Sequence, residues 1–63
     1  MKLNTYRVQT AFMESGMGQA HLARKIGVSS GTISYILNGG GCSPRTLNRL
    51  AKELEVDSES LRG

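Results

Sequence analysis

Apolar residues recur along this chain every three or four positions, and no segment alternates apolar and polar residues with a period of two. The first spacing is typical of helices with one buried face, and the second is typical of half-buried strands. The pattern is clearest after Ser43 and Pro44, which suit the N-cap and the first turn of a helix. The apolar face of that helix consists of Leu47, Leu50, Ala51 and Leu54. The sequence therefore predicts an all-α protein.

Another helix is predicted near the start of the chain. Asn4 can cap it, Thr5 is its first residue, and Gly16 ends it. Its apolar stripe is expected to consist of Tyr6, Val8, Phe12 and Met13. This stripe would pack the helix against the rest of the domain, with Tyr6 in the core or at its rim.

Two short helices are predicted in the middle of the chain. The earlier one covers residues 19–26 and ends at Gly27, because glycine adopts a left-handed conformation without steric cost. The later one begins after a cap at Ser29 or Ser30 and ends near Asn38. Their inward-facing residues are expected to be Leu22, Ala23 and Ile26 in the earlier helix and Ile33, Ile36 and Leu37 in the later one.

A last, short helix is predicted after Asp57 or Ser58, with Leu61 packed inward and Val56 just ahead of it. The three glycines at residues 39–41 are interpreted as a loop within one domain and not as a linker between two. The sequence thus predicts a single domain over residues 1–63, built as a compact bundle of four or five helices.

Residues 19–38 meet the demands of a helix-turn-helix, in which a short turn joins two helices that pack closely where they cross. Ala23 supplies the small side chain needed at the crossing, and Gly27 follows it by four positions. Val28 is then placed to fill the turn from inside. The pattern predicts a helix-turn-helix from about Gln19 to Asn38.

The chain resembles the lambda-repressor-like, or XRE and Cro, family of phage and bacterial repressors. The resemblance runs through residues 19–28 and 32–39, then through 43–47, 50–51 and the ending at 54–56, and it covers nearly the whole chain. It implies the five-helix fold of that family, with the third helix in the major groove of double-stranded DNA.

The resemblance also implies which residues read bases. Its base-reading positions correspond here to Ser29, Ser30, Gly31, Ser34 and Tyr35. Helical period supports the same set, because an inward stripe at Ile33 and Ile36 leaves these residues on the outer face. Serine hydroxyls both donate and accept hydrogen bonds and so discriminate bases poorly, which makes Tyr35 the most distinctive reader.

Phosphate contacts are expected from helix ends and from basic side chains beside the groove. Residues matching phosphate-binding positions of the family are Gln19, Asn38 and Arg45. Further candidates are Arg7, Lys25 and Arg49. The family's usual capping serine, threonine or asparagine is replaced by Gly18, which weakens the start of the second helix.

Charge agrees with a polyanionic partner. The net charge is +3 and the acidic residues cluster near the end, where Glu53, Glu55, Asp57 and Glu59 lie. Up to Lys52 the only acid is Glu14, set against seven basic residues: Lys2, Arg7, Arg24, Lys25, Arg45, Arg49 and Lys52. A chain that is basic up to Lys52 and acidic after it would attract DNA to one face and repel it from another.

The sequence argues against an enzyme, a metal site and a cofactor. His21 has no cysteine, histidine or carboxylate at a metal-binding spacing, and residues 39–41 lack the Gly-Lys-Ser or Gly-Lys-Thr ending of a phosphate-binding loop. A chain this short also has little room for a ligand pocket. The lone Cys42 and the lack of a long apolar run predict a cytoplasmic protein without a membrane span.

We therefore expect a sequence-specific transcriptional regulator, namely a phage or bacterial repressor that binds a palindromic operator as a homodimer. The family's bulky aromatic residue near Leu61 is missing, which weakens the case for its usual dimer contact. One alternative is the DNA-binding module of a larger transposition or replication protein. Another is a helix-turn-helix fold used for protein–protein interaction, since fold alone does not fix function.

Overall fold

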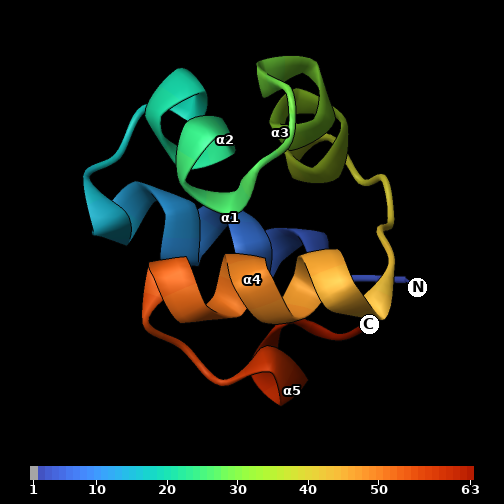
Figure 1. The fold of residues 1–63 in the computed structure, drawn as a ribbon. Helices are drawn as coiled ribbons and strands as arrows, with labels where there is room; N and C mark the ends of the chain where they lie inside the picture. The colour runs from blue at the N-terminus through green and yellow to red at the C-terminus, as the bar shows by residue number, and fades with distance from the viewer. Residues whose placement is uncertain (1) are drawn as a thin grey trace.

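Five helices follow one another along the chain at the places where the sequence predicts them. They are α1 (Thr5–Ser15), α2 (Gln19–Ile26), α3 (Ser30–Leu37), α4 (Pro44–Leu54) and α5 (Ser58–Leu61). The structure is a computed structural model that describes residues 2–63. In Figure 1, α2 and α3 lie above α1 and α4, and α5 lies below them. The predicted all-α bundle is confirmed, with five helices.

Most of the helices begin at a residue whose side chain accepts a hydrogen bond from a backbone N–H of the first turn. These capping residues are Asn4, Ser29, Ser43 and Asp57. The open choices are thereby settled in favour of Ser29 for α3 and Asp57 for α5. Helix α2 begins after Gly18, which offers no side-chain hydrogen bond, as the sequence indicates.

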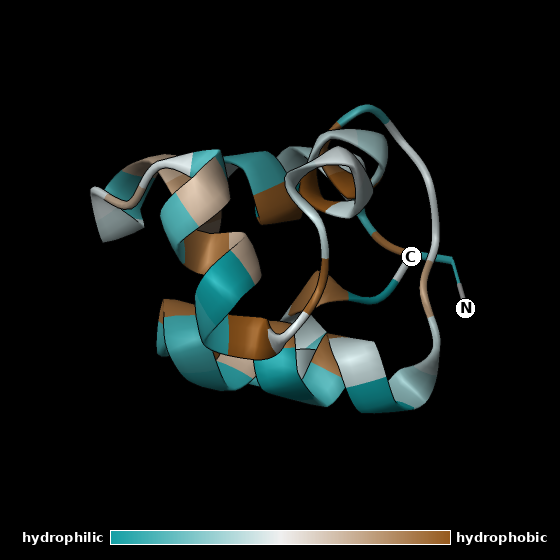
Figure 2. Ribbon diagram, turned by 45° about the horizontal axis from the view of Figure 1, so that its top comes forward, coloured by the Kyte–Doolittle hydropathy of each residue, from teal (hydrophilic) through white to brown (hydrophobic). Residues whose placement is uncertain are grey.

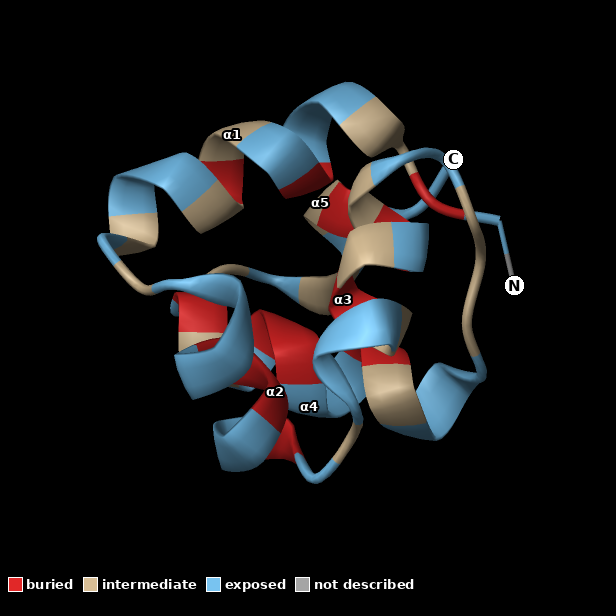
Figure 3. Ribbon diagram, turned by 90° about the horizontal axis from the view of Figure 1, so that it is seen from above, coloured by how far each residue is buried: buried red, intermediate tan, exposed pale blue. Residues whose placement is uncertain are grey.

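The core lies where the five helices face one another. Figure 3, seen from above, shows buried segments on the inner sides of the helices and exposed segments around the outside. The most deeply buried large side chains of the core are Val8, Leu22, Ile33, Ile36, Leu50 and Leu61. Each of the five helices contributes at least one of them. Burial of one apolar side chain of this size stabilises a fold by about 1.5–3 kcal/mol, so these contacts dominate the stability of so small a domain.

The predicted apolar stripe of α1 is wrong at two of its four positions. Tyr6 and Met13 are 76% and 78% exposed, whereas Val8 and Ala11 are buried and Phe12 is partly buried. Successive helical residues are rotated by about 100°, so Tyr6 lies about 200° around the helix from Val8. Tyr6 and Met13 share a face because they are two turns apart, but that face points to solvent.

The two ends of the chain pair with each other. An isolated antiparallel bridge joins Leu3 to Arg62. The backbone N–H of Asn4 donates to the Leu61 carbonyl at 2.7 Å, and the Gly63 N–H donates to the Lys2 carbonyl at 3.1 Å. These bonds tie α5 to the start of α1, and both ends lie on the same side of the molecule in Figure 1.

Each long helix combines hydrophobic and hydrophilic stretches, as Figure 2 shows by colour. This mixture is expected of helices that bury one side only. Within residues 2–63, no helix combines the length and the apolar character needed to cross a membrane.

Candidate nucleic-acid interface

The turn between α2 and α3 has the geometry that the sequence predicts. Ala23 is buried, and Gly27 adopts the left-handed conformation with φ 78°. The N–H groups of Gly27 and Val28 both donate to the Ala23 carbonyl, the second at 2.9 Å. Val28 is partly buried against the core, as its predicted role in the turn requires. These contacts set the angle at which α3 leaves α2.

A small hydrogen-bond group holds the start of α3. The Ser29 hydroxyl accepts from the Thr32 N–H at 3.1 Å and pairs with the Thr32 hydroxyl at 3.0 Å. Ser29 therefore has a structural role as the N-cap, which satisfies one of the free amides of the first turn.

The outer face of α3 carries the predicted base-reading residues. Ser30, Gly31 and Tyr35 are exposed on it, and Tyr35 keeps 64% of its surface in contact with solvent. Ser34 is half-buried, and Ser29 is exposed at the start of the helix. Ile33 and Ile36 are buried on the opposite side. The structure thus brings all five predicted readers to one surface.

The end of α3 is held by a residue that the sequence analysis missed. The Gln9 side-chain amide of α1 donates to the Leu37 carbonyl at 2.6 Å. The Asn38 side-chain amide donates to the Ser34 carbonyl at 2.7 Å. Nothing in the helical pattern marks Gln9, because a polar residue on the exposed side of a helix is the ordinary case.

The predicted phosphate-binding residues are all exposed, but they differ in their partners. Gln19 is the first residue of α2, Lys25 lies in its last turn, and Arg45 lies in the first turn of α4. The Arg49 guanidinium instead donates to the Ile26 carbonyl at 3.3 Å and so supports the end of α2. The Arg7 guanidinium donates to the Ser60 carbonyl of α5 at 3.5 Å, and Figure 1 shows α5 on the opposite side of the molecule from α2 and α3.

Comparison with protein families decides the identity of this arrangement. A family model described as a helix-turn-helix domain matches residues 2–62. The chain belongs to this helix-turn-helix family. It is of the lambda-repressor type, as the resemblance in the sequence predicts, and it is a DNA-binding domain. No curated protein and no solved structure matches the chain.

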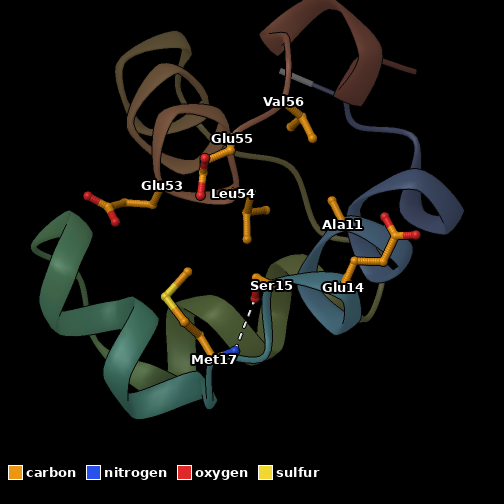
Figure 4. Close-up of a pocket in the computed structure, with 8 residues that line it drawn as sticks. All are labelled: Ala11, Glu14, Ser15, Met17, Glu53, Leu54, Glu55 and Val56. Atoms are coloured by element: carbon orange, nitrogen blue, oxygen red, sulfur yellow. Dashed lines mark hydrogen bonds between the residues drawn. The ribbon is translucent and has the colours of Figure 1, made fainter.

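Two hollows of the helix-turn-helix domain differ in the charges that line them, although Glu53 contributes to both. A hollow of about 190 Å³ beside the α2–α3 turn is lined by Ile26, by Glu53 and by three basic residues, Lys25, Arg49 and Lys52. A larger hollow of about 380 Å³, shown in Figure 4, lies between the C-terminal ends of α1 and α4 and is lined by Glu14, Glu53 and Glu55 among others. The acidic end is therefore unsuited to a phosphate backbone.

Few of these charges are neutralised within the domain. Over residues 2–63 the one ion pair joins Arg62 to Glu59 at 3.0 Å, and both side chains are well exposed. Exposed pairs of this kind contribute little to stability. Among the other described basic residues, Arg49 and Arg7 donate hydrogen bonds to backbone carbonyls, and none forms an ion pair within the domain.

The described part of the helix-turn-helix domain offers no cluster of three or more metal-ligating side chains. Cys42 is a free thiol in the loop before α4, and partial burial raises its pKa above the usual value. A raised pKa keeps the thiol protonated and unreactive at neutral pH.

Proposed function

We propose that this helix-turn-helix domain is a sequence-specific transcriptional regulator that inserts α3 into the major groove. The observation that carries the proposal is the outer face of α3, where polar side chains and the exposed Tyr35 lie opposite a fully buried apolar face. Residues 1–63 act as one DNA-binding unit in this proposal, and the unit has no catalytic role.

The proposed readers differ in their contributions. Tyr35 offers a ring and a hydroxyl to base edges and thymine methyl groups, and it is the main source of discrimination. Ser30 and Ser34 add hydroxyl groups, and Gly31 allows the helix backbone to approach the bases closely. Ser29 contributes only what remains after its hydrogen bonds to Thr32. Water and DNA shape supply the rest of the specificity.

Gln19, Arg45 and Lys25 are the main phosphate contacts in the proposal, and Asn38 contributes what remains after its side-chain hydrogen bond to the Ser34 carbonyl. Gln19 is the first residue of α2 and Arg45 lies in the first turn of α4, so each extends from a helix start that favours anions. Arg49 and Arg7 have minor roles, because a phosphate would compete with their hydrogen bonds to the Ile26 and Ser60 carbonyls. These contacts carry affinity and not sequence preference.

We further propose that the regulator is a phage or bacterial repressor, acting in the cytoplasm as a homodimer on a palindrome. One small module contacts only a few bases, and a two-fold dimer doubles that contact. Its two copies of α3 would then enter grooves about 34 Å apart.

Selection of bound duplexes from a random DNA pool at physiological salt tests these proposals, with the oligomeric state measured alongside. An enriched palindrome supports the dimeric repressor, whereas an enriched single half-site supports a module of a larger transposition or replication protein. Absence of binding refutes the proposal and directs attention to a protein partner. Salt dependence separates DNA binding from binding to a protein partner, because phosphate contacts weaken steeply with ionic strength and apolar protein contacts do not.

A further inference from the structure

The chain turns sharply at the end of α3. Gly39 adopts φ 102°, a conformation that favours glycine, and its N–H donates to the Ile36 carbonyl at 3.2 Å. The Gly40 N–H donates to the Tyr35 carbonyl at 2.9 Å. This pair of hydrogen bonds forms a Schellman motif, which brings residue 40 back over residue 35.

The Tyr35 ring occupies the space in which a side chain at residue 40 would lie. A Cβ added to Gly40 would lie 2.6 Å from Cζ of Tyr35 and closer still to its Cδ2 and Cε2 atoms. Real Cβ atoms essentially never come within 3.0 Å of another heavy atom. The Schellman motif commonly pairs two hydrophobic side chains at these positions, and here glycine leaves the space to the ring alone.

Backbone conformation does not explain glycine at this position. The glycines with positive φ are Gly16, Gly27 and Gly39, so Gly40 has a conformation that other residues adopt freely. What glycine provides at residue 40 is room for the ring.

We infer that Gly40 is a positioning residue that fixes the orientation of the Tyr35 ring for base reading. One side of the ring lies against the loop backbone, while 64% of the residue stays exposed to contact DNA. A ring held in this way loses less freedom on binding than a freely rotating one. The inference rests on the proposed function, because it gives Gly40 a role through a proposed reader.

The test is a double-mutant cycle of Gly40→Ala and Tyr35→Ala, with base preference measured for each variant by pool selection. Tyr35→Ala should change the preference at one base step by roughly fivefold or more. Gly40→Ala should change the preference at the same step, because the new methyl group displaces the ring. In the Tyr35→Ala background it should change preference by less than about twofold, because no ring is left to displace.

Gly18→Ala is the matched control. It makes the same substitution at an unstrained glycine, but a Cβ there meets no atom within 4 Å. It should leave base preference unchanged. A nuclear Overhauser contact between the Tyr35 ring and the Gly40 α-protons reports the packing without DNA, and it should be present in the native protein.

Three results would overturn the inference. One is a native protein without that contact. Another is Gly40→Ala leaving preference unchanged while Tyr35→Ala alters it. The third is Gly40→Ala acting equally in both backgrounds, which would mean that it works through the loop. If the native protein itself selects no sequence, the proposed function fails and the inference fails with it, a result distinct from the other three.

Discussion

Gly27→Ala tests whether the turn between α2 and α3 depends on left-handed backbone. Gly27 has φ 78°, and a left-handed conformation costs a residue with a Cβ about 1–2 kcal/mol. Alanine also restricts the unfolded chain, which returns about 0.4–1 kcal/mol. The added Cβ meets the Arg49 guanidinium at 3.4 Å, an ordinary contact that adds no large steric cost. We therefore expect a net loss of about 1 kcal/mol.

Urea unfolding followed by circular dichroism measures this loss. A domain of 63 residues has a total stability of roughly 3–9 kcal/mol, so the change is well resolved, and Tm should fall by about 4–8 °C. Gly31→Ala is the matched control: it lies inside α3 with its nearest neighbour at 3.7 Å, and it should stabilise the domain by about 0.5–1 kcal/mol. Gly27→Asn should cost less than Gly27→Ala, because asparagine tolerates the left-handed region. Equal or higher stability of Gly27→Ala would refute the reasoning.

Four further predictions concern three single residues. Arg45→Ala should weaken binding to all DNA sequences alike and reduce the slope of log affinity against log salt by about 1. Arg24→Ala, outside the proposed contacts, should change the affinity and the slope less. Equal affinity of the native protein and Arg45→Ala would remove Arg45 from the interface. Glu55→Gly should stabilise the domain by about 0.5–1 kcal/mol in urea unfolding, because Glu55 has φ 58°; a loss of stability would contradict this. The raised pKa of Cys42 predicts slower alkylation at pH 8 in the folded than in the urea-unfolded chain. Its sign also predicts that stability falls as pH rises through the alkaline range, because the fold favours the neutral thiol, and Cys42→Ser should flatten that fall.

The helix boundaries were predictable because they depend on local signals. Ser43 and Pro44 start α4, Gly16 and Gly27 end α1 and α2, and the structure agrees with each. Capping side chains and left-handed glycines act within four residues of one another, so the sequence alone carries the information. The exposed positions of Ser30, Gly31 and Tyr35 were also predictable, because the inward stripe of α3 fixes its outer face, whereas Ser29 lies at the N-cap ahead of the helix.

Contacts between helices were less accessible to sequence reasoning. The phase of α1 was misjudged, since two large apolar residues, Tyr6 and Met13, suggested a stripe that the fold leaves in solvent. Hydrophobicity ranks residues but does not say which side of a helix its neighbours cover. Gly40 was hidden for a related reason, because its role depends on where the Tyr35 ring lies and not on its own backbone.

Helix α3 owes its rigidity to other parts of the domain. It has eight residues, fewer than an isolated helix needs to persist in water. Ser29 caps its start, Gln9 of α1 holds the Leu37 carbonyl at its end, and Ile33 and Ile36 anchor its inner side. Apart from Ser29, its outer face can therefore consist of small polar residues and one tyrosine, because these side chains do not cap the helix or anchor it in the core. This division leaves the positions of the proposed base readers free to change while the fold stays the same.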